Sequence, residues 1–298
     1  MLIHQPGAGR AGCGNVGGEG RVPEVAGGVM GVPEAILLGA AQGITEFWPI
    51  SSSAHIALLI HLGGWGKPDL SFMVALHLGT WIAVVWYYRR RLLGLVTAWL
   101  REVGGKEKGN PDARLTWMLL LATVPGTLLG AVFAESSEMM EGMPLLMVVT
   151  LAAFGVVLWA TDARGKDIRT WNTAGWREAL AVGVAQALAI MPGVSRSGAT
   201  ISAARAAGME RKEAADFAFL LSVPIIGAAA AYEGLKLVRD GIPGGMGWNM
   251  LAGGITAALT GYFAINFLLS RLKRGTFRPY AVYRLLLAAL LLIVLVLL

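Results

Sequence analysis

Apolar segments long enough to cross a membrane dominate this chain and leave it few folds. They cover about 70–88, 114–133, 144–161, 213–232, 247–270 and 280–298. Each approaches the roughly 20 residues that a bilayer-spanning helix needs. The composition agrees, because 55% of the residues are hydrophobic and only 15% are charged, whereas soluble domains carry about 25% charged residues. The sequence therefore predicts an all-α polytopic membrane protein.

Further apolar segments are too short to span. They cover about 33–47, 51–62, 176–190 and 195–207. A helix of about 15 residues rises about 22 Å, against a hydrocarbon core of about 30 Å. The short segments pair across Trp48-Pro49-Ile50 and across Met191-Pro192-Gly193-Val194. Each pair is predicted to form a re-entrant helix-turn-helix hairpin, which enters and leaves the membrane on one side.

Loop charges support six transmembrane helices plus two hairpins that do not cross. Basic residues gather at about 89–114, 162–177 and 271–279, whereas the segment at 134–143 has Glu but no Lys or Arg. Short loops rich in Lys and Arg stay in the cytoplasm. The charges of successive loops alternate correctly between the two sides of the membrane only if the first hairpin opens to the outside and the second to the cytoplasm. The net charge of +6 is therefore assigned to membrane orientation, and nucleic-acid binding is not expected.

The first 29 residues differ from the rest. Residues 1–29 are rich in Gly and hold no apolar run, so we expect a disordered extension before a single membrane domain at 30–298. Met30 directly precedes the apolar pattern and is an alternative translation start. Cys13 is the single cysteine, which excludes an intrachain disulfide.

The membrane domain contains a weak internal repeat. At an offset of 144, Gly39 matches Gly183, Gln42 matches Gln186, Ser51 matches Ser195, and Ser53 matches Ser197. The repeats cover about 33–161 and 176–298, and each holds one hairpin and three spans. An odd number of spans inverts the second copy, so we predict an inverted-topology repeat. In such folds broken helices meet near the midplane, with helix N-termini facing anions.

Ionisable groups in apolar segments are candidates for function. Glu46 follows Gln42 by four residues, so both face one side of a helix. A carboxylate there suits a metal ligand or a general base, although a carboxylate at a helix end in the headgroup region is the alternative. Arg284, in the last span, is also charged, but the sequence assigns it no role.

A run of three serines follows Pro49 at the predicted start of a helix. One serine is enough to cap a helix, so Ser51, Ser52 and Ser53 leave hydroxyls free to bind or attack a phosphate. His55 follows the first two serines by four and three residues and is predicted to reach either hydroxyl. A histidine in an apolar helix is otherwise structural, as we expect for His77.

The second polar stretch surrounds Arg196, which lies between Ser195 and Ser197. A planar guanidinium binds phosphate through two hydrogen bonds, and the glycines on either side let backbone N–H groups approach an anion. Thr200 follows Arg196 by four residues and adds a hydroxyl. The alternative is an arginine that extends to the membrane edge.

At these residues the chain resembles the bacterial undecaprenyl-diphosphatase family of the bacitracin-resistance type. The resemblance covers about residues 30–298, and its most specific blocks are Gly43 to His55 and Pro192 to Thr200. It implies hydrolysis of undecaprenyl diphosphate to undecaprenyl phosphate and inorganic phosphate, which recycles the lipid carrier of cell-wall synthesis. It also implies a bacterial plasma (inner) membrane location with the site open to the outer, periplasmic side. Membrane lipids are expected partners, and a homodimer is left open.

The resemblance also implies a divalent cation, Mg²⁺ or Ca²⁺, with Glu46 as its ligand. The site residues that the resemblance implies are Glu46, Ser51, Ser52, His55, Ser195, Arg196 and Thr200. Together with the serine and glutamine positions of the two motifs, we predict Glu46, Ser52, His55 and Arg196 as catalytic and Gln42, Ser51, Ser53, Ser195, Ser197 and Thr200 as substrate-binding. Family members often carry Glu where this chain has Gln42, which removes one negative charge from the site.

The expected mechanism uses Ser52 as the nucleophile and Arg196 as the phosphate clamp. Ser51 and His55 remain alternative nucleophiles. Inverted repeats with re-entrant hairpins also occur in transporters, so a transporter or flippase of a polyprenyl phosphate lipid is the rival function.

Overall fold

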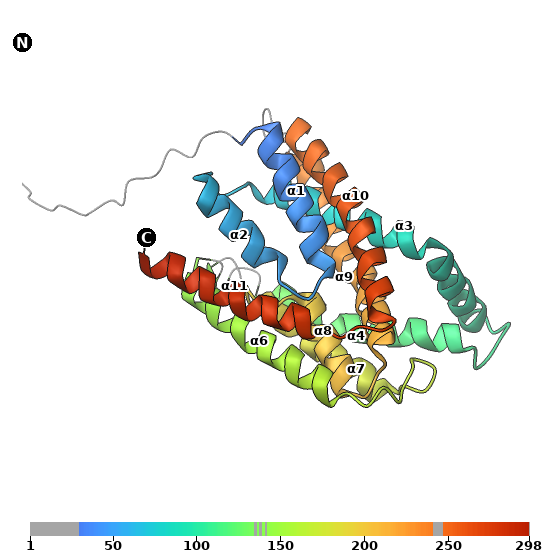
Figure 1. Ribbon diagram of the computed structural model, residues 1–298. Helices are drawn as coiled ribbons and strands as arrows, with labels where there is room; N and C mark the ends of the chain where they lie inside the picture. The colour runs from blue at the N-terminus through green and yellow to red at the C-terminus, as the bar shows by residue number, and fades with distance from the viewer. Residues whose placement is uncertain (1–29, 134–135, 137–138, 141, 241–246, 298) are drawn as a thin grey trace, which may run out of the picture.

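Helices make up the regular structure of the part of the chain that is described by the computed structural model, residues 30–133, 136, 139–140, 142–240 and 247–297 (Figure 1). The helices are α1 Val32–Phe47, α2 Ser52–Gly63, α3 Leu70–Val103, α4 Pro111–Val132, α6 Pro144–Arg164, α7 Trp176–Ala187, η1 Leu188–Ile190, α8 Arg196–Ala206, α9 Arg211–Asp240, α10 Gly247–Leu272 and α11 Arg278–Leu297. Within these ranges one isolated β-bridge joins Arg169 to Met209. The predicted disordered extension at 1–29 lies outside the described residues.

The long and short helices match the predicted ones. In the described part of the chain, six helices are long and apolar enough to cross a membrane, namely α3, α4, α6, α9 as far as Tyr232, α10 and α11. The short helices α1, α2, α7 and α8 have 16, 12, 12 and 11 residues. The predicted all-α multi-pass membrane protein is therefore confirmed. The entry of both hairpins from single sides of the membrane stays a prediction.

The helices extend further than the hydropathy pattern suggests. Helix α3 has 34 residues and continues to Val103, so most of the loop predicted at 89–114 is helical. Helix α9 continues to Asp240 through the start of the loop predicted at 233–246. The reason is that charged residues mark where a helix leaves the apolar layer, whereas Arg, Leu, Glu and Lys all favour continued helix. Loop charge therefore did not predict where these helices end.

Glycines let the first helix of each hairpin pack closely on a long helix. Helix α1 packs on α10, and a Cβ at Gly39 would lie 2.3 Å from the carbonyl oxygen of Gly253. Helix α7 packs on α4, and a Cβ at Gly183 would lie 2.5 Å from the carbonyl oxygen of Ala122. Such close approach of backbones is typical of small residues between membrane helices. Figure 1 shows α1 beside α10, and α11 along α6.

The tips of the two hairpins meet. The backbone N–H of Gly193 donates to Ser53 Oγ at 3.3 Å, and Ser197 Oγ donates to the carbonyl of Trp48 at 3.2 Å. Residues far apart in the sequence therefore come together at one place. The inversion of the second half relative to the membrane stays a prediction.

Candidate active site

A cavity of about 440 Å³ lies where the hairpin tips face α3 and α9. Its polar wall is formed by Gln42, Glu46, Ser51, Ser52, Ser53, His77, Ser195 and Arg196. Its apolar wall is formed by Leu70, Met73, Val74, Ala189, Met191, Ile225, Ile226, Ala229 and Ala230. A cavity lined by both polar and apolar side chains suits a ligand that has a charged head and an apolar tail.

Glu46 is the centre of the polar wall. Its Oε2 accepts hydrogen bonds from Ser52 Oγ at 2.9 Å and from Gln42 Nε2 at 3.1 Å. Its Oε1 pairs with Arg196 Nη2 at 3.1 Å, and both side chains are largely buried, with 8% and 13% of their surface exposed. The structure therefore joins the predicted acid, the predicted nucleophile and the predicted phosphate clamp. Arg196 faces this carboxylate and does not extend to the membrane edge.

The serines that precede α2 and α8 share an unusual backbone conformation. Ser51 has φ 74° and ψ 101°, and Ser195 has φ 68° and ψ 113°. Positive φ is unfavourable for residues with a Cβ, and such strain gathers at functional sites. Each serine also hydrogen-bonds the serine two residues later, since Ser51 Oγ lies 3.1 Å from Ser53 Oγ and Ser195 Oγ lies 3.2 Å from Ser197 Oγ. Both repeats thus present their serines in the same way.

Several predicted substrate-binding hydroxyls have structural partners. Ser195 Oγ accepts from the backbone N–H of Gly198 at 3.1 Å, which is a helix N-cap. Thr200 Oγ1 donates to the carbonyl of Arg196 at 2.8 Å, and its side chain is fully buried. Thr200 does not line the cavity that holds Glu46. Thr200 therefore supports the first turns of α8, and the sequence spacing could not separate this role from phosphate binding.

His55 lines a different cavity. Its Nδ1 lies 2.7 Å from the carbonyl oxygen of Ser51, and its Nε2 lies 2.7 Å from the hydroxyl of Tyr283. The two rings are stacked, with an interplanar angle of 3°. The cavity that His55 lines has a volume of about 580 Å³ and lies among α1, α10 and α11. The predicted approach of His55 to a serine hydroxyl is not found in this structure.

Arg284 holds both hairpin tips, a role that the sequence did not assign. The side chain is fully buried, and its Nη2 donates to the carbonyls of Gly193 at 2.8 Å and Val194 at 3.0 Å. Its Nη1 donates to the carbonyl of Pro49 at 3.3 Å, and its Nε donates to the carbonyl of Leu151 at 3.2 Å. In the sequence, the signal for this role was that Arg284 is a charged residue within an apolar span. The guanidinium satisfies carbonyls that two irregular loops would otherwise leave unpaired.

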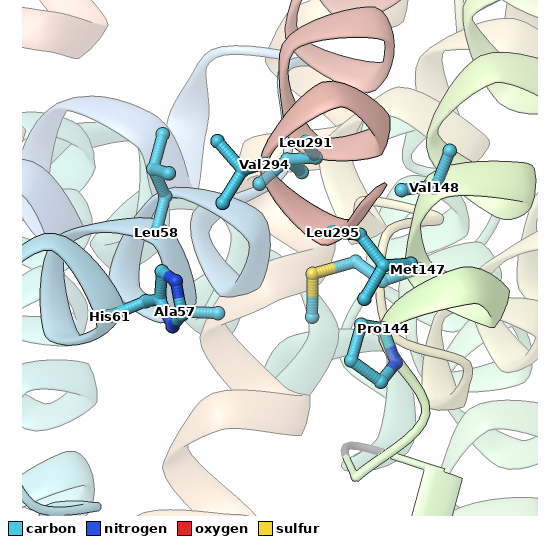
Figure 2. A pocket seen from close by; sticks show the side chains of 9 residues that line it. All are labelled: Ala57, Leu58, His61, Pro144, Met147, Val148, Leu291, Val294 and Leu295. Carbon is cyan, nitrogen blue, oxygen red and sulfur yellow. The ribbon is translucent and has the colours of Figure 1, made fainter. Parts of the chain in front are cut away.

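A third cavity, of about 240 Å³, lies between α2, α6 and α11. Figure 2 shows its lining, in which His61 is the polar side chain among apolar neighbours such as Leu58, Met147 and Leu291. None of the predicted site residues lines it. This groove is therefore separate from the polar wall that holds Glu46.

The polar wall offers oxygen ligands but a single carboxylate. Among the described residues, no three His, Cys, Asp or Glu side chains form a group that could hold a metal ion. Glu46 Oε1 is also paired with a cation, Arg196. Carboxylate, amide and hydroxyl oxygens are nevertheless the donors that Mg²⁺ and Ca²⁺ prefer. These residues fit a hard cation if the ligand itself supplies further negative oxygens.

Comparison with known proteins identifies the family. The model of the family described as bacitracin resistance protein BacA matches residues 35–290. Similar curated proteins include the undecaprenyl-diphosphatase of Moorella thermoacetica, 44% identical over 261 residues that cover 88% of this chain and 97% of that protein. Undecaprenyl-diphosphatase 2 of Stutzerimonas stutzeri is 39% identical, with 89% of this chain and 98% of that protein covered. From the match over nearly the whole membrane domain, we conclude that this chain belongs to the BacA family.

Proposed function

We propose that this chain hydrolyses undecaprenyl diphosphate to undecaprenyl phosphate and inorganic phosphate, which recycles the lipid carrier of cell-wall synthesis. The names of its relatives support this function. The observation that carries it is that Arg196 and Ser52 bind the same carboxylate, in a cavity that is also lined by apolar side chains. The polar side chains suit the diphosphate, and the apolar side chains suit the first isoprene units.

Without substrate, Arg196 and Glu46 are paired with each other, and binding of the diphosphate breaks this pair. Arg196 exchanges its bond to Glu46 for bonds to the terminal phosphate, because a planar guanidinium binds two phosphate oxygens at once. The N-termini of α2 and α8 begin at Ser52 and Arg196, and both carry partial positive charge. These groups stabilise the charge that develops on the phosphoryl oxygens in the transition state.

Ser52 is the proposed nucleophile. Its Oγ attacks the terminal phosphorus, the bond from this phosphorus to the bridging oxygen breaks, and undecaprenyl phosphate leaves. The hydroxyl proton passes to Glu46 Oε2, which accepts the Ser52 hydrogen bond at 2.9 Å. Water then attacks the phosphoserine phosphorus and the bond from phosphorus to the serine oxygen breaks. Glu46 returns its proton to the serine oxygen, and the protons of the water leave with the inorganic phosphate. Ser51 and His55 are less suited, because both nitrogens of the His55 ring have partners and Ser51 Oγ bonds Ser53.

The proposed cofactor is Mg²⁺ or Ca²⁺, held by Glu46 and by oxygens of the substrate, with the side-chain amide of Gln42 as a further donor. When bound, the cation would neutralise part of the diphosphate charge. Since Gln42 adds no charge, we expect the cation to bind together with the substrate and weakly without it.

The proposed location is the bacterial inner membrane, with the cavity open to the outer side. The cavity is lined by the beginning of α3, from Leu70 to His77, and by Ile225 to Ala230 of α9. The first segment is the beginning of α3, and the second lies in the second half of α9, so both are several helical turns from the basic residues at Arg89–Arg91 and Arg211–Lys212. Basic ends face the cytoplasm, which supports an outward opening. A homodimer stays a prediction, to be checked by particle mass in nanodiscs.

Phosphate release from undecaprenyl diphosphate by the purified full chain in detergent tests the proposal. We expect turnover by the wild type, and losses on the order of 100- to 1000-fold for Arg196→Ala and Ser52→Ala. The matched controls are Arg278→Ala and Ser270→Ala, whose side chains are exposed outside the cavity. A wild-type protein that binds the lipid but releases no phosphate is not a phosphatase, and near-normal Ser52→Ala activity would exclude this nucleophile.

A further inference from the structure

Two histidines near the hairpin tip line different cavities. His55 lines the cavity of about 580 Å³, whereas His77 of α3 lines the cavity that also holds Glu46, Ser52 and Arg196. The sequence motif contains His55 and not His77, but only His77 lines the cavity that holds Glu46. The histidine inside the motif, His55, therefore does not line the cavity with the polar wall, whereas His77, outside the motif, does.

The His77 ring is fixed by one nitrogen and leaves the other free. Its Nδ1 lies 2.8 Å from the carbonyl oxygen of Met73, one helical turn earlier. A carbonyl oxygen only accepts, so Nδ1 carries the proton and donates. Within the described ranges no hydrogen bond engages Nε2. His55 is anchored by Nδ1 in the same way, but its Nε2 is taken by Tyr283.

His77 lines the same cavity as the charged groups of the polar wall. Within that cavity Glu46 bonds Ser52 and Arg196. A diphosphate that binds Arg196 and lies near Ser52 brings its phosphate oxygens to this wall. A phosphate oxygen and an imidazole nitrogen form a hydrogen bond by sharing one proton, whichever partner carries it.

We propose that His77 contacts the diphosphate group of the substrate directly through Nε2, as a substrate-binding residue of the reaction cavity. This inference rests on the proposed function, because it takes the head group in this cavity to be a diphosphate. His55 then acts through the protein, since its ring holds the carbonyl of Ser51 and thereby the strained start of α2.

Steady-state phosphate release by His77→Ala and His77→Gln tests the contact. We expect kcat/KM to fall on the order of 10- to 100-fold in His77→Ala, the effect of one hydrogen bond to a charged group. The glutamine amide reaches a similar position and donates, so His77→Gln should remain within about 3-fold of the wild type. The matched controls are His61→Ala and His61→Gln in the separate apolar groove. A His77→Ala enzyme within 2-fold of the wild type, or a His77→Gln enzyme as poor as His77→Ala, overturns the proposal.

A binding measurement separates this inference from the proposed reaction. The full chain with ¹⁵N-labelled histidine is titrated in nanodiscs with methylenediphosphonate, a diphosphate analogue that cannot be hydrolysed. We expect one Nε2 signal to shift and to be missing in His77→Gln. A shift confined to the His55 signal, or no shift of any imidazole, overturns the contact. A His77 shift in a protein that releases no phosphate from the lipid supports the contact and refutes the hydrolysis.

Discussion

Replacing Arg284 by methionine removes the guanidinium that joins the two hairpin tips. Its two shortest bonds, to the carbonyls of Gly193 and Val194 at 2.8 Å and 3.0 Å, hold the loop that ends at Ser195. The bond to the carbonyl of Pro49 at 3.3 Å holds the other loop. Hydrogen bonds from charged groups contribute about 1.5–3 kcal/mol each in soluble proteins, but polar pairs in membranes average about 0.6 kcal/mol.

Two bonds at about 1.5 kcal/mol each give about 3 kcal/mol, or roughly a 100-fold decrease in the population of aligned tips. We therefore expect Arg284→Met to lower kcat by on the order of 100-fold, while KM changes much less, because Ser52 is displaced relative to the bound phosphate. Arg284→Lys should be intermediate, since an ammonium reaches fewer carbonyls than a guanidinium.

The assay is phosphate release from undecaprenyl diphosphate, together with the distance between spin labels on the two hairpins. The matched control is Arg278→Met, which removes the same charge from an exposed position of α11. Wild-type kcat in Arg284→Met with an unchanged distance between the labels would refute the positioning role. A lower kcat with an unchanged distance would also refute it, because the loss would then arise elsewhere.

Three further predictions follow from packing and charge. Gly183→Ala should lower the melting temperature by several degrees, because the added Cβ would lie 2.5 Å from a backbone carbonyl oxygen. The control Gly130→Ala should not lower it, because open space surrounds that position. Thermal unfolding in detergent measures both. Glu46→Gln should reduce phosphate release at least 100-fold and remove its dependence on chelator, since it removes the carboxylate that accepts the Ser52 proton and holds the proposed cation. Arg205→Met should destabilise the protein by about 1–3 kcal/mol, because it removes a fully buried guanidinium from Asp162 and Asp167, although Arg211 still pairs with both; the surviving folded fraction should keep its KM.

Much of the fold was predictable from hydropathy and segment length. The six long helices and the four short ones follow from apolar runs that either reach or fall short of the bilayer thickness. The ends of α3 and α9 were not predictable, because Arg89 to Val103 contains strong helix formers and few helix breakers. Hydropathy predicts where a helix leaves the lipid, but it does not predict the residue at which the helix ends.

The candidate site was predictable where the motif itself supplies the contacts. Glu46 and Ser52 are six residues apart and face each other across a single tight turn, so local sequence brings them together. The direction of His55 was not predictable, because it depends on Tyr283, which is 228 residues away. The place of His77 was not predictable for the same reason, since only the packing of α3 against α1 brings it to the cavity that Glu46 lines.

The strain at Ser51 and Ser195 explains why neither hairpin forms the site alone. A positive φ at a residue with a Cβ costs about 1–2 kcal/mol, and glycine would avoid this cost but would lose the hydroxyl. The bonds that offset the strain cross between the tips, from Gly193 N–H to Ser53 and from Arg284 to carbonyls of both loops. Each hairpin therefore depends on the other for the conformation that presents its serine, so two motifs separated by most of the chain form a single site.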